Sequence, residues 1–193
     1  MIAQPDIPSR LTPQEYLDWE AQQEYRYEYI DGEIIAMTGG TIPHNDIALN
    51  FYSALRPFLR QRGCRANVSD VKVEDSKNER YFYPDLVVTC DAEDLRAQDL
   101  VKHPTVIVEV LSPSTAGGDR GTKLKCYRQI PSLQEYVLVD SQSMAVELYR
   151  RGDGKMWLYS EYESGETVRL ESLDFEVELS VLYDNVNLPS EAN

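Results

Sequence analysis

The segment from Pro104 to Asp140 constrains the fold most, because it predicts a strand, a helix and a second strand in close succession. Residues 105–111 are apolar, rich in β-branched side chains and too few for a typical helix, which predicts a buried strand. Serine, proline and glycine residues break this run before a predicted helix over 119–129 and a strand over 135–139. The pattern predicts a right-handed crossover between two parallel strands.

The crossover carries charged residues where a core is expected. Glu109 interrupts the first strand, and a carboxylate buried there costs roughly several kcal/mol unless a cation or hydrogen bonds meet it. Asp119, Lys123 and Tyr127 are spaced to share one face of the helix. Because the helix begins where the strand ends, it can carry Lys123 back toward Glu109. Asp119 either orients Lys123 or caps the helix, and Tyr127 either lines a site or packs in the core.

The rest of the chain adds helices and strands to the crossover. The run Thr12 to Glu15 matches a capping box, and Asp31-Gly32 between two alternating segments predicts a hairpin. The fold class is therefore α/β (α+β): a central mixed β-sheet flanked by helices, with extra C-terminal strands. We expect a single domain over residues 1–193. We predict a loose N-terminal arm at 1–10 and tail at 185–193, helices at 12–23 and 44–61, and strands at 26–30, 33–37, 65–73, 80–89, 145–149, 155–161, 167–170 and 176–179.

The net charge of −14 is an obstacle to nucleic-acid binding, because phosphates repel an acidic surface. The basic residues are nevertheless concentrated in two segments, 49–68 and 112–131, which both fall on predicted helices. If these helices face the same side, they form a basic groove; otherwise they are ordinary solvated helix faces. The residues concerned are Arg56, Arg60, Arg62 and Arg65 in the first segment, and Arg120, Lys123, Lys125 and Arg128 in the second.

The cysteines and the N-terminus suggest the compartment. Cys64, Cys90 and Cys126 are far apart and form neither a CxxC pair nor a zinc-type spacing. No basic segment followed by an apolar one marks a signal peptide, and no apolar run is long enough to span a bilayer. We therefore expect a cytoplasmic protein with three reduced thiols.

Two strand-embedded carboxylates predict a metal site. Asp85 follows Pro84 directly before the apolar run 86–88, and Glu109 lies in the next long strand. If the strands are neighbours, the two carboxylates cannot both stay ionised cheaply, so either one is protonated or a divalent cation lies between them. The alternative to a metal site is a pair of buried structural carboxylates. Mg²⁺ or Mn²⁺ suits such oxygen ligands, and the backbone carbonyl of Val110 can add another. Lys123 would then place a positive charge opposite the metal.

These residues resemble a known nuclease motif. Pro84-Asp85, Glu109-Val110-Leu111 and a lysine on the next helix look like the PD-(D/E)XK nuclease superfamily. Its usual motif has the lysine at the position of Leu111, but some branches move it to the following helix, as Lys123 would be here. More closely, the strings YIDGEI, IPHNDI, YPDLVV, VEVLSPST and DRGTKLKCY…QEYVLVD are similar to the Uma-two family of restriction-endonuclease-like proteins over residues 12–140.

The resemblance implies a restriction-endonuclease-like core and metal-dependent hydrolysis of DNA. It makes Asp85 and Glu109 metal ligands and Lys123 the lysine of the motif. Glu33 is either a further acid at the site or a solvent-side hairpin residue. His44 contacts a phosphate or carries a proton, or else it is a capping or surface residue. We expect DNA contacts from four basic residues of the two helices: Arg56, Arg60, Arg120 and Lys125.

Two rival functions stay open. The first is a catalytically silent module of the same fold that binds nucleic acid or a protein, which the acidic surface favours. The second is a metal-dependent hydrolase of another phosphate ester. A homodimer is also possible, because many nucleases of this fold cut both strands as dimers.

Overall fold

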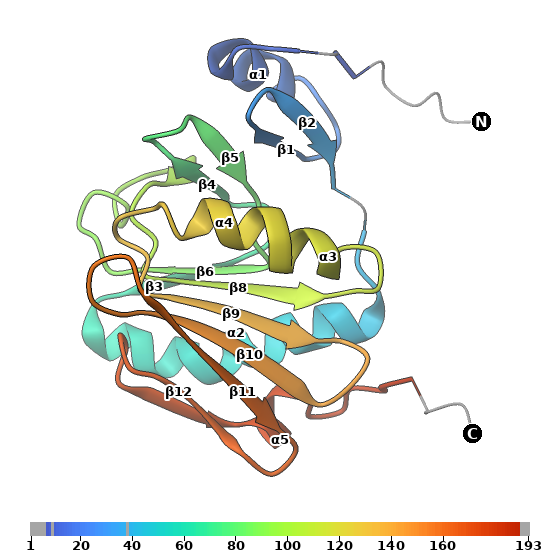
Figure 1. Cartoon of the computed structure of the whole chain (residues 1–193), viewed down its shortest axis with the longest axis vertical. Helices are drawn as coiled ribbons and strands as arrows, with labels where there is room; N and C mark the ends of the chain where they lie inside the picture. The colour runs from blue at the N-terminus through green and yellow to red at the C-terminus, as the bar shows by residue number, and fades with distance from the viewer. Residues whose placement is uncertain (1–6, 9, 38, 190–193) are drawn as a thin grey trace.

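The computed structural model of the chain describes residues 7–8, 10–37 and 39–189 (Figure 1). Residues 1–6 and 9 of the predicted N-terminal arm, and residues 190–193 of the predicted tail, lie outside this part of the chain. Among the described residues, no helix combines the length and apolar character needed to cross a membrane.

A six-stranded mixed sheet forms the centre of the molecule, in the order β11-β10-β9-β8-β6-β3 (Figure 1). β8 and β9 are parallel, with Val106 opposite Glu135, while the other neighbours in this sheet are antiparallel. The crossover and the mixed sheet are therefore confirmed. The strands are β3 (Arg65–Val68), β6 (Leu86–Thr89), β8 (Val106–Leu111), β9 (Glu135–Asp140), β10 (Ala145–Arg151) and β11 (Trp157–Glu163).

A second, five-stranded sheet has the order β2-β1-β5-β4-β7. Its β1–β2 hairpin turns at Asp31-Gly32, where both residues have positive φ (52° and 94°), as predicted from the sequence. The hairpin lies above the central sheet next to α1, which begins with the expected capping box at Thr12 (Figure 1). The elements are α1 (Pro13–Glu20), β1 (Tyr27–Ile30), β2 (Glu33–Ala36), β4 (Lys72–Asp75), β5 (Arg80–Phe82) and β7 (Leu100–Val101).

Within residues 65–89 the chain crosses twice between the two sheets, which corrects the two long strands predicted over residues 65–73 and 80–89. The first divides into β3 and β4 at Ser69-Asp70, where both residues have positive φ (49° and 34°). The second divides into β5 and β6 around Pro84, which has no N–H to continue a ladder. Asp85 thus lies at the junction of the sheets, and its backbone carbonyl accepts a hydrogen bond from the N–H of Ser69 (2.9 Å).

The central sheet is covered on both faces. Leu86 and Val88 pack in one apolar cluster with α2 (Ile42–Arg62), whereas Val87 packs in the other with Tyr127 of the crossover helix. Because these strand residues alternate, α2 and the crossover helix lie on opposite faces (Figure 1). A single basic groove built from both helices is therefore not formed. The α2 face is completed by β12 (Thr167–Leu170), β13 (Phe175–Glu178) and α5 (Leu179–Leu182).

The crossover helix is irregular. It consists of α3 (Ala116–Gly118), a π-helical turn η1 (Asp119–Lys123) and α4 (Leu124–Tyr127), so it begins and ends earlier than the predicted 119–129. In the π-turn, the carbonyl of Asp119 accepts from the N–H of Leu124 and also from the Tyr136 hydroxyl (3.2 Å). Such turns are frequent at functional sites.

The prediction of three free thiols is wrong. Arg65 of β3 is opposite Thr89 of β6, and this register brings the flanking residues Cys64 and Cys90 together in a disulfide. Their 26-residue separation hid the pairing, because the intervening chain leaves the sheet and returns to it. Cys126 is free and buried.

Candidate active site

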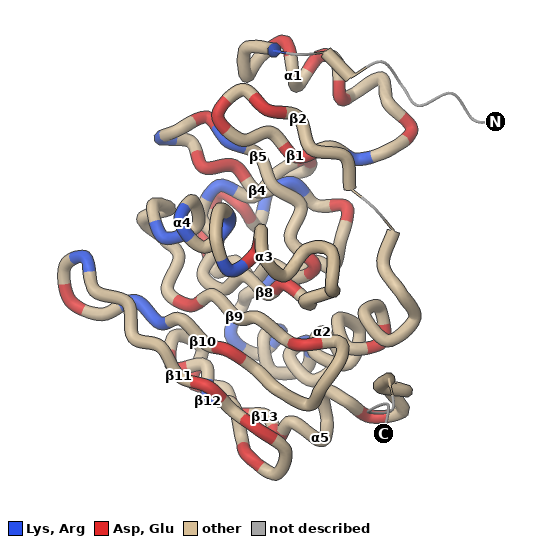
Figure 2. The backbone as a smooth tube through the Cα atoms, turned by 45° about the vertical axis from the view of Figure 1, so that its right-hand side comes forward, with Lys and Arg blue, Asp and Glu red and all other residues tan. Residues whose placement is uncertain are grey.

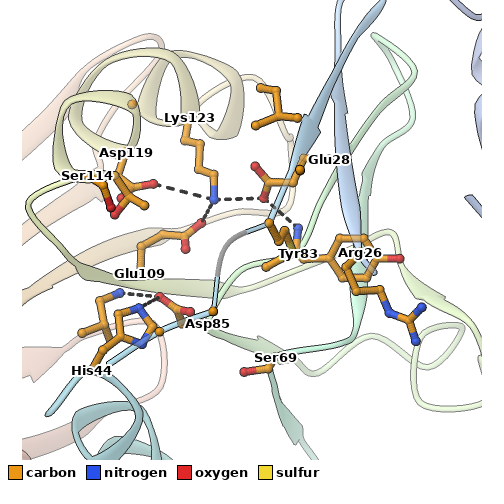
Figure 3. Close-up of a pocket in the computed structure, with 18 of the residues that line it drawn as sticks. Arg26, Glu28, His44, Ser69, Tyr83, Asp85, Glu109, Ser114, Asp119 and Lys123 are labelled. Atoms are coloured by element: carbon orange, nitrogen blue, oxygen red, sulfur yellow. Dashed lines mark hydrogen bonds and ion pairs between the residues drawn. The ribbon is translucent and has the colours of Figure 1, made fainter. Parts of the chain in front are cut away.

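A cavity of about 1090 Å³ opens where the two sheets meet the crossover helix. Its walls come from the β1–β2 hairpin, the start of α2, the Ser69-Asp70 turn, the ends of β6 and β8, and the crossover helix (Figure 3). The lining includes seven carboxylate residues against two that carry a permanent positive charge, Arg26 and Lys123. The acids are Glu24, Glu28, Glu33, Asp70, Asp85, Glu109 and Asp119.

Asp85 and Glu109 meet across neighbouring strands. β6 and β8 are antiparallel with Leu86 opposite Val108, and one further step of this register places Asp85 opposite Glu109. Asp85 Oδ2 accepts a hydrogen bond from the N–H of Val110 (2.7 Å) and lies 3.2 Å from His44 Nε2 (Figure 3). His44 therefore reaches the site from the first turn of α2, although the cap of that helix is Thr41.

Lys123 points into the same cavity from the π-turn (Figure 3). Its Nζ is 3.0 Å from Glu109 Oε1, 2.9 Å from Glu28 Oε1 and 3.7 Å from Asp119 Oδ1. Tyr127 donates its hydroxyl to the same Glu109 oxygen (2.8 Å), so it both packs in the core and contacts the site. The helix thus carries Lys123 to Glu109, as its spacing predicted.

Glu28 is a site residue that the sequence reasoning missed. It lies in β1, it is only 5% exposed, and its Oε1 accepts from the N–H of Tyr83 (3.0 Å) as well as contacting Lys123. A signal was available, because Glu28 is a carboxylate between two tyrosines of an alternating strand, much as Glu109 interrupts an apolar one. Glu33, the acid of this hairpin for which the sequence suggested a site role, is exposed on β2 and lines the outer part of the cavity.

Burial and charge together set the ionisation of the central groups. Burial raises the pKa of Glu109 well above its usual range, with Asp85, Asp119 and Glu28 adding to the rise and Lys123 opposing it. Burial also raises the pKa of Asp119. Burial would lower the pKa of Lys123, but the charges of Glu109, Glu28 and Asp119 outweigh it and raise that pKa. Lys123 is therefore an ammonium at neutral pH.

The pKa of His44 is also set by burial and by nearby charges. Burial opposes its protonation, but the hydrogen bond and charge of Asp85, helped by the Val110 backbone and by Asp119, raise the pKa of His44. The imidazolium is thus more populated at neutral pH than in a free histidine.

The donor set fits a hard divalent cation. Asp85 uses Oδ2 and Glu109 uses Oε1 for the contacts given above, while Asp85 Oδ1 and Glu109 Oε2 accept no hydrogen bond from the part of the chain that the structure describes. Two carboxylates with one free oxygen each, beside a cavity that admits water, are the ligands that Mg²⁺ or Mn²⁺ prefers.

The residues expected to touch DNA are dispersed. Arg56 and Arg60 are exposed on α2, on the other face of the central sheet from Lys123. Arg120 pairs with Glu147 through a 2.6 Å contact, and Lys125 is exposed on α4.

A second cluster of potential metal ligands lies beyond the other end of β6. Oxygens of Asp91 and Asp94 and a ring nitrogen of His103 lie within 4.8 Å of one another, the one such three-residue group found among the described residues. The Asp94 carboxylate, however, already accepts from the N–H groups of Lys102 (2.9 Å) and His103 (2.8 Å) and from the Thr89 hydroxyl (2.9 Å). The Asp94 carboxylate therefore holds the loop between β6 and β8 in place by hydrogen bonds.

The chain is similar to proteins of cyanobacteria. It is 37% identical over 185 residues to "Uncharacterized protein slr1290" of Synechocystis sp., covering 95% of this chain and 97% of that protein. It is also 37% identical over 163 residues to "Uncharacterized protein sll1609" of the same organism, covering 83% and 92%.

Its fold is that of a solved structure described as "a putative nuclease belonging to DUF820" from Anabaena variabilis. The TM-score is 0.73 at 21% identity, over 90% of this chain and 97% of the other. The family model Uma2, described as "Putative restriction endonuclease", matches residues 13–182. The matched span, the fold and the sequence motifs all agree. The chain therefore belongs to the Uma2 family of restriction-endonuclease-like proteins.

Proposed function

We propose that the protein is a metal-dependent endonuclease that hydrolyses phosphodiester bonds of DNA in the acid-lined cavity. The observation that carries the proposal is the arrangement of Asp85, Glu109 and Lys123. Two carboxylates from neighbouring strands each keep one oxygen free, and the ammonium of Lys123, whose side chain is 15% exposed, lies beside them. With a divalent cation held by the two carboxylates, that cation and the Lys123 ammonium would stabilise the negative charge that develops when a phosphodiester is attacked.

The cation would be Mg²⁺ or Mn²⁺, held by Asp85 and Glu109 with help from the carbonyl of Val110. It would supply Lewis-acid stabilisation of the phosphate charge. Lys123 would orient the attacking water or stabilise the phosphate oxygens, since its ammonium is fixed by three carboxylates.

Other residues of the cavity would support these three. Tyr127 orients Glu109 through its hydroxyl, and Asp119 orients Lys123. His44 holds Asp85 and, with its raised pKa, can give a proton to the leaving oxygen. Glu33, at the outer part of the cavity, would assist a second cation or position water.

DNA would approach over the crossover helix, which presents Arg120 and Lys125. Arg56 and Arg60 would take part only if the DNA bends around the sheet to reach α2. Because DNA is the proposed substrate, we place the protein in the cytoplasm, and a cut through both strands would need two copies of the chain.

The test is cleavage of supercoiled plasmid and of labelled oligonucleotides with Mn²⁺, Mg²⁺ or EDTA, comparing wild type with Asp85→Asn and Lys123→Ala. We expect metal-dependent cleavage that both variants lose. If wild type binds DNA but cleaves no substrate with either metal, the protein is a catalytically silent binding module of the same fold.

A further inference from the structure

A second pocket, of about 440 Å³, lies between the crossover helix and the turn that joins β10 to β11. We call it the basic pocket, because its lining holds four cationic residues and no acidic one. Figure 2 shows basic segments in blue on α4 and on the β10–β11 hairpin. The cations are Lys125, Arg128, Arg151 and Lys155, and Trp157 lies among them.

These four cations have no carboxylate partner within 4.0 Å among the described residues. Their neighbours in the sequence do: Arg120 pairs with Glu147, and Arg150 with Glu135. Asp153 lies in the same β10–β11 turn, but it does not line the pocket. In a chain with 33 acidic residues against 19 basic ones, a pocket of uncompensated cations indicates an anionic ligand.

Trp157 and two arginines give the pocket a fixed aromatic centre. Arg151 donates to the backbone carbonyls of Leu133 (2.6 Å) and Ile130 (2.7 Å), and its guanidinium carbon is 4.6 Å from the centre of the Trp157 ring. The guanidinium carbon of Arg128 is 5.9 Å from the same ring. Burial and the nearby charge of Arg128 lower the pKa of Arg151, as expected for like charges that a bound anion would relieve.

We propose that the basic pocket binds single-stranded nucleic acid. Its phosphates would contact Lys125, Arg128 and Lys155, while a base stacks on the Trp157–Arg128 pair. Aromatic side chains with cations beside them are the usual platform for unpaired bases, whose faces are accessible only in a single strand. A duplex would need a wider basic face than four residues on a protein of net charge −14 provide.

The pocket also has a defined relation to the acid-lined cavity. Lys123 and Lys125 lie two residues apart on the crossover helix, and they line the cavity and the basic pocket respectively. A strand held in the pocket can therefore cross this helix to reach Lys123. The idea that a strand bound in the basic pocket is cleaved at Lys123 rests on the proposed function. The binding of the strand to the basic pocket does not.

The test measures binding without catalysis. Fluorescence anisotropy of a labelled oligothymidylate is titrated in EDTA at several salt concentrations with wild type, Arg128→Ala/Lys155→Ala and Trp157→Ala. We expect the double variant to bind at least about tenfold more weakly and its salt slope to fall by about 1.4, because two phosphate contacts are lost. Trp157→Ala should weaken binding about tenfold through lost stacking. Arg151 is left intact, because its carbonyl contacts support the fold.

The matched control is Lys77→Ala/Arg96→Ala, which removes the same two charges from exposed sites. The proposal is overturned if the control loses as much affinity as Arg128→Ala/Lys155→Ala, if wild type shows no salt-dependent binding, or if a duplex binds the pocket more tightly than the single strand. If wild type binds but never cleaves, the nuclease proposal fails and the binding site stands.

Discussion

The two ends of β6 hold two acidic groups that look alike in the sequence and differ in what occupies their oxygens. Before the strand, Asp85 accepts one backbone N–H and leaves an oxygen free beside a large cavity. After it, Asp94 is 1% exposed and accepts two backbone N–H groups and a hydroxyl. A carboxylate whose lone pairs are satisfied by the backbone holds a loop, whereas one that keeps a free oxygen can bind a ligand.

The largest effect should come from the Asp85 end. Asp85→Asn removes a proposed cation ligand, so we expect cleavage to fall about a thousandfold, equivalent to about 4 kcal/mol of barrier. Asp91→Asn, at the other end of β6, is the matched control and should keep cleavage within about threefold. Initial rates with saturating Mn²⁺ measure both. Equal losses in the two variants would abolish the distinction between the ends.

The free energy of unfolding should depend more on Asp94 than on Asp85. Asp94→Ala leaves the N–H groups of Lys102 and His103 without their acceptor, whereas the Thr89 hydroxyl can still donate to the His103 carbonyl (3.0 Å), so unfolding should cost about 4 kcal/mol less in urea titrations. Asp85→Asn in EDTA should change stability by less than about 1 kcal/mol, since it also relieves repulsion with Glu109. A stable Asp94→Ala protein would show that the loop does not depend on this carboxylate.

Cation binding should also differ between the two ends of β6. Millimolar Mn²⁺ at about a hundredfold excess over its dissociation constant should stabilise wild type by about 2.7 kcal/mol, because it binds only the folded protein. Thermal unfolding measures this shift. Asp85→Asn should lose it and His103→Ala should keep it. The reverse pattern would move the cation site to the Asp91–Asp94–His103 cluster.

The disulfide lies at the same end as Asp94, and its removal should also act on stability. Cys64→Ser/Cys90→Ser frees a 26-residue loop in the unfolded chain, which should cost about 3 kcal/mol under oxidising conditions. Urea titrations with and without dithiothreitol measure this cost, with Cys126→Ser as the single-thiol control. A reducing cytoplasm would hold wild type in the less stable form. No difference between reduced and oxidised wild type would contradict the structural role.

The smallest effect concerns pH at the Asp85 end. The raised pKa of His44 means that its contribution to stability is fully present below its unfolded pKa and is lost as pH rises through its folded pKa. In EDTA, wild type should exceed His44→Gln by of order 1 kcal/mol near pH 6 and by less near pH 9. Thermal unfolding across this range is the measurement. A constant difference would show that His44 is not protonated beside Asp85.

The sequence predicted the local elements and the approach of Lys123 to Glu109, because strand–helix–strand periodicity fixes both. It did not predict Glu28, since that contact joins residues 28 and 123 through the packing of two sheets. The breaks at Ser69-Asp70 and Pro84 were read as parts of longer strands, because single residues that change sheets interrupt an apolar pattern only slightly. The Cys64–Cys90 bond required the β3–β6 register, which spacing alone cannot give.

The π-turn of the crossover helix sets the spacing of the polar residues Asp119, Lys123 and Tyr127. A π-turn accommodates one more residue than regular α-helical winding would. Deletion of Gly121 would restore that winding and shorten the spacing between Asp119 and Lys123 from four residues to three. The Asp119 carbonyl, which accepts from the Tyr136 hydroxyl and from the N–H of Leu124 five residues on, would then be four residues from Leu124, as in a regular α-helix. A single codon therefore changes the spacing of these two residues along the helix, while the acid and the lysine stay on one face of it.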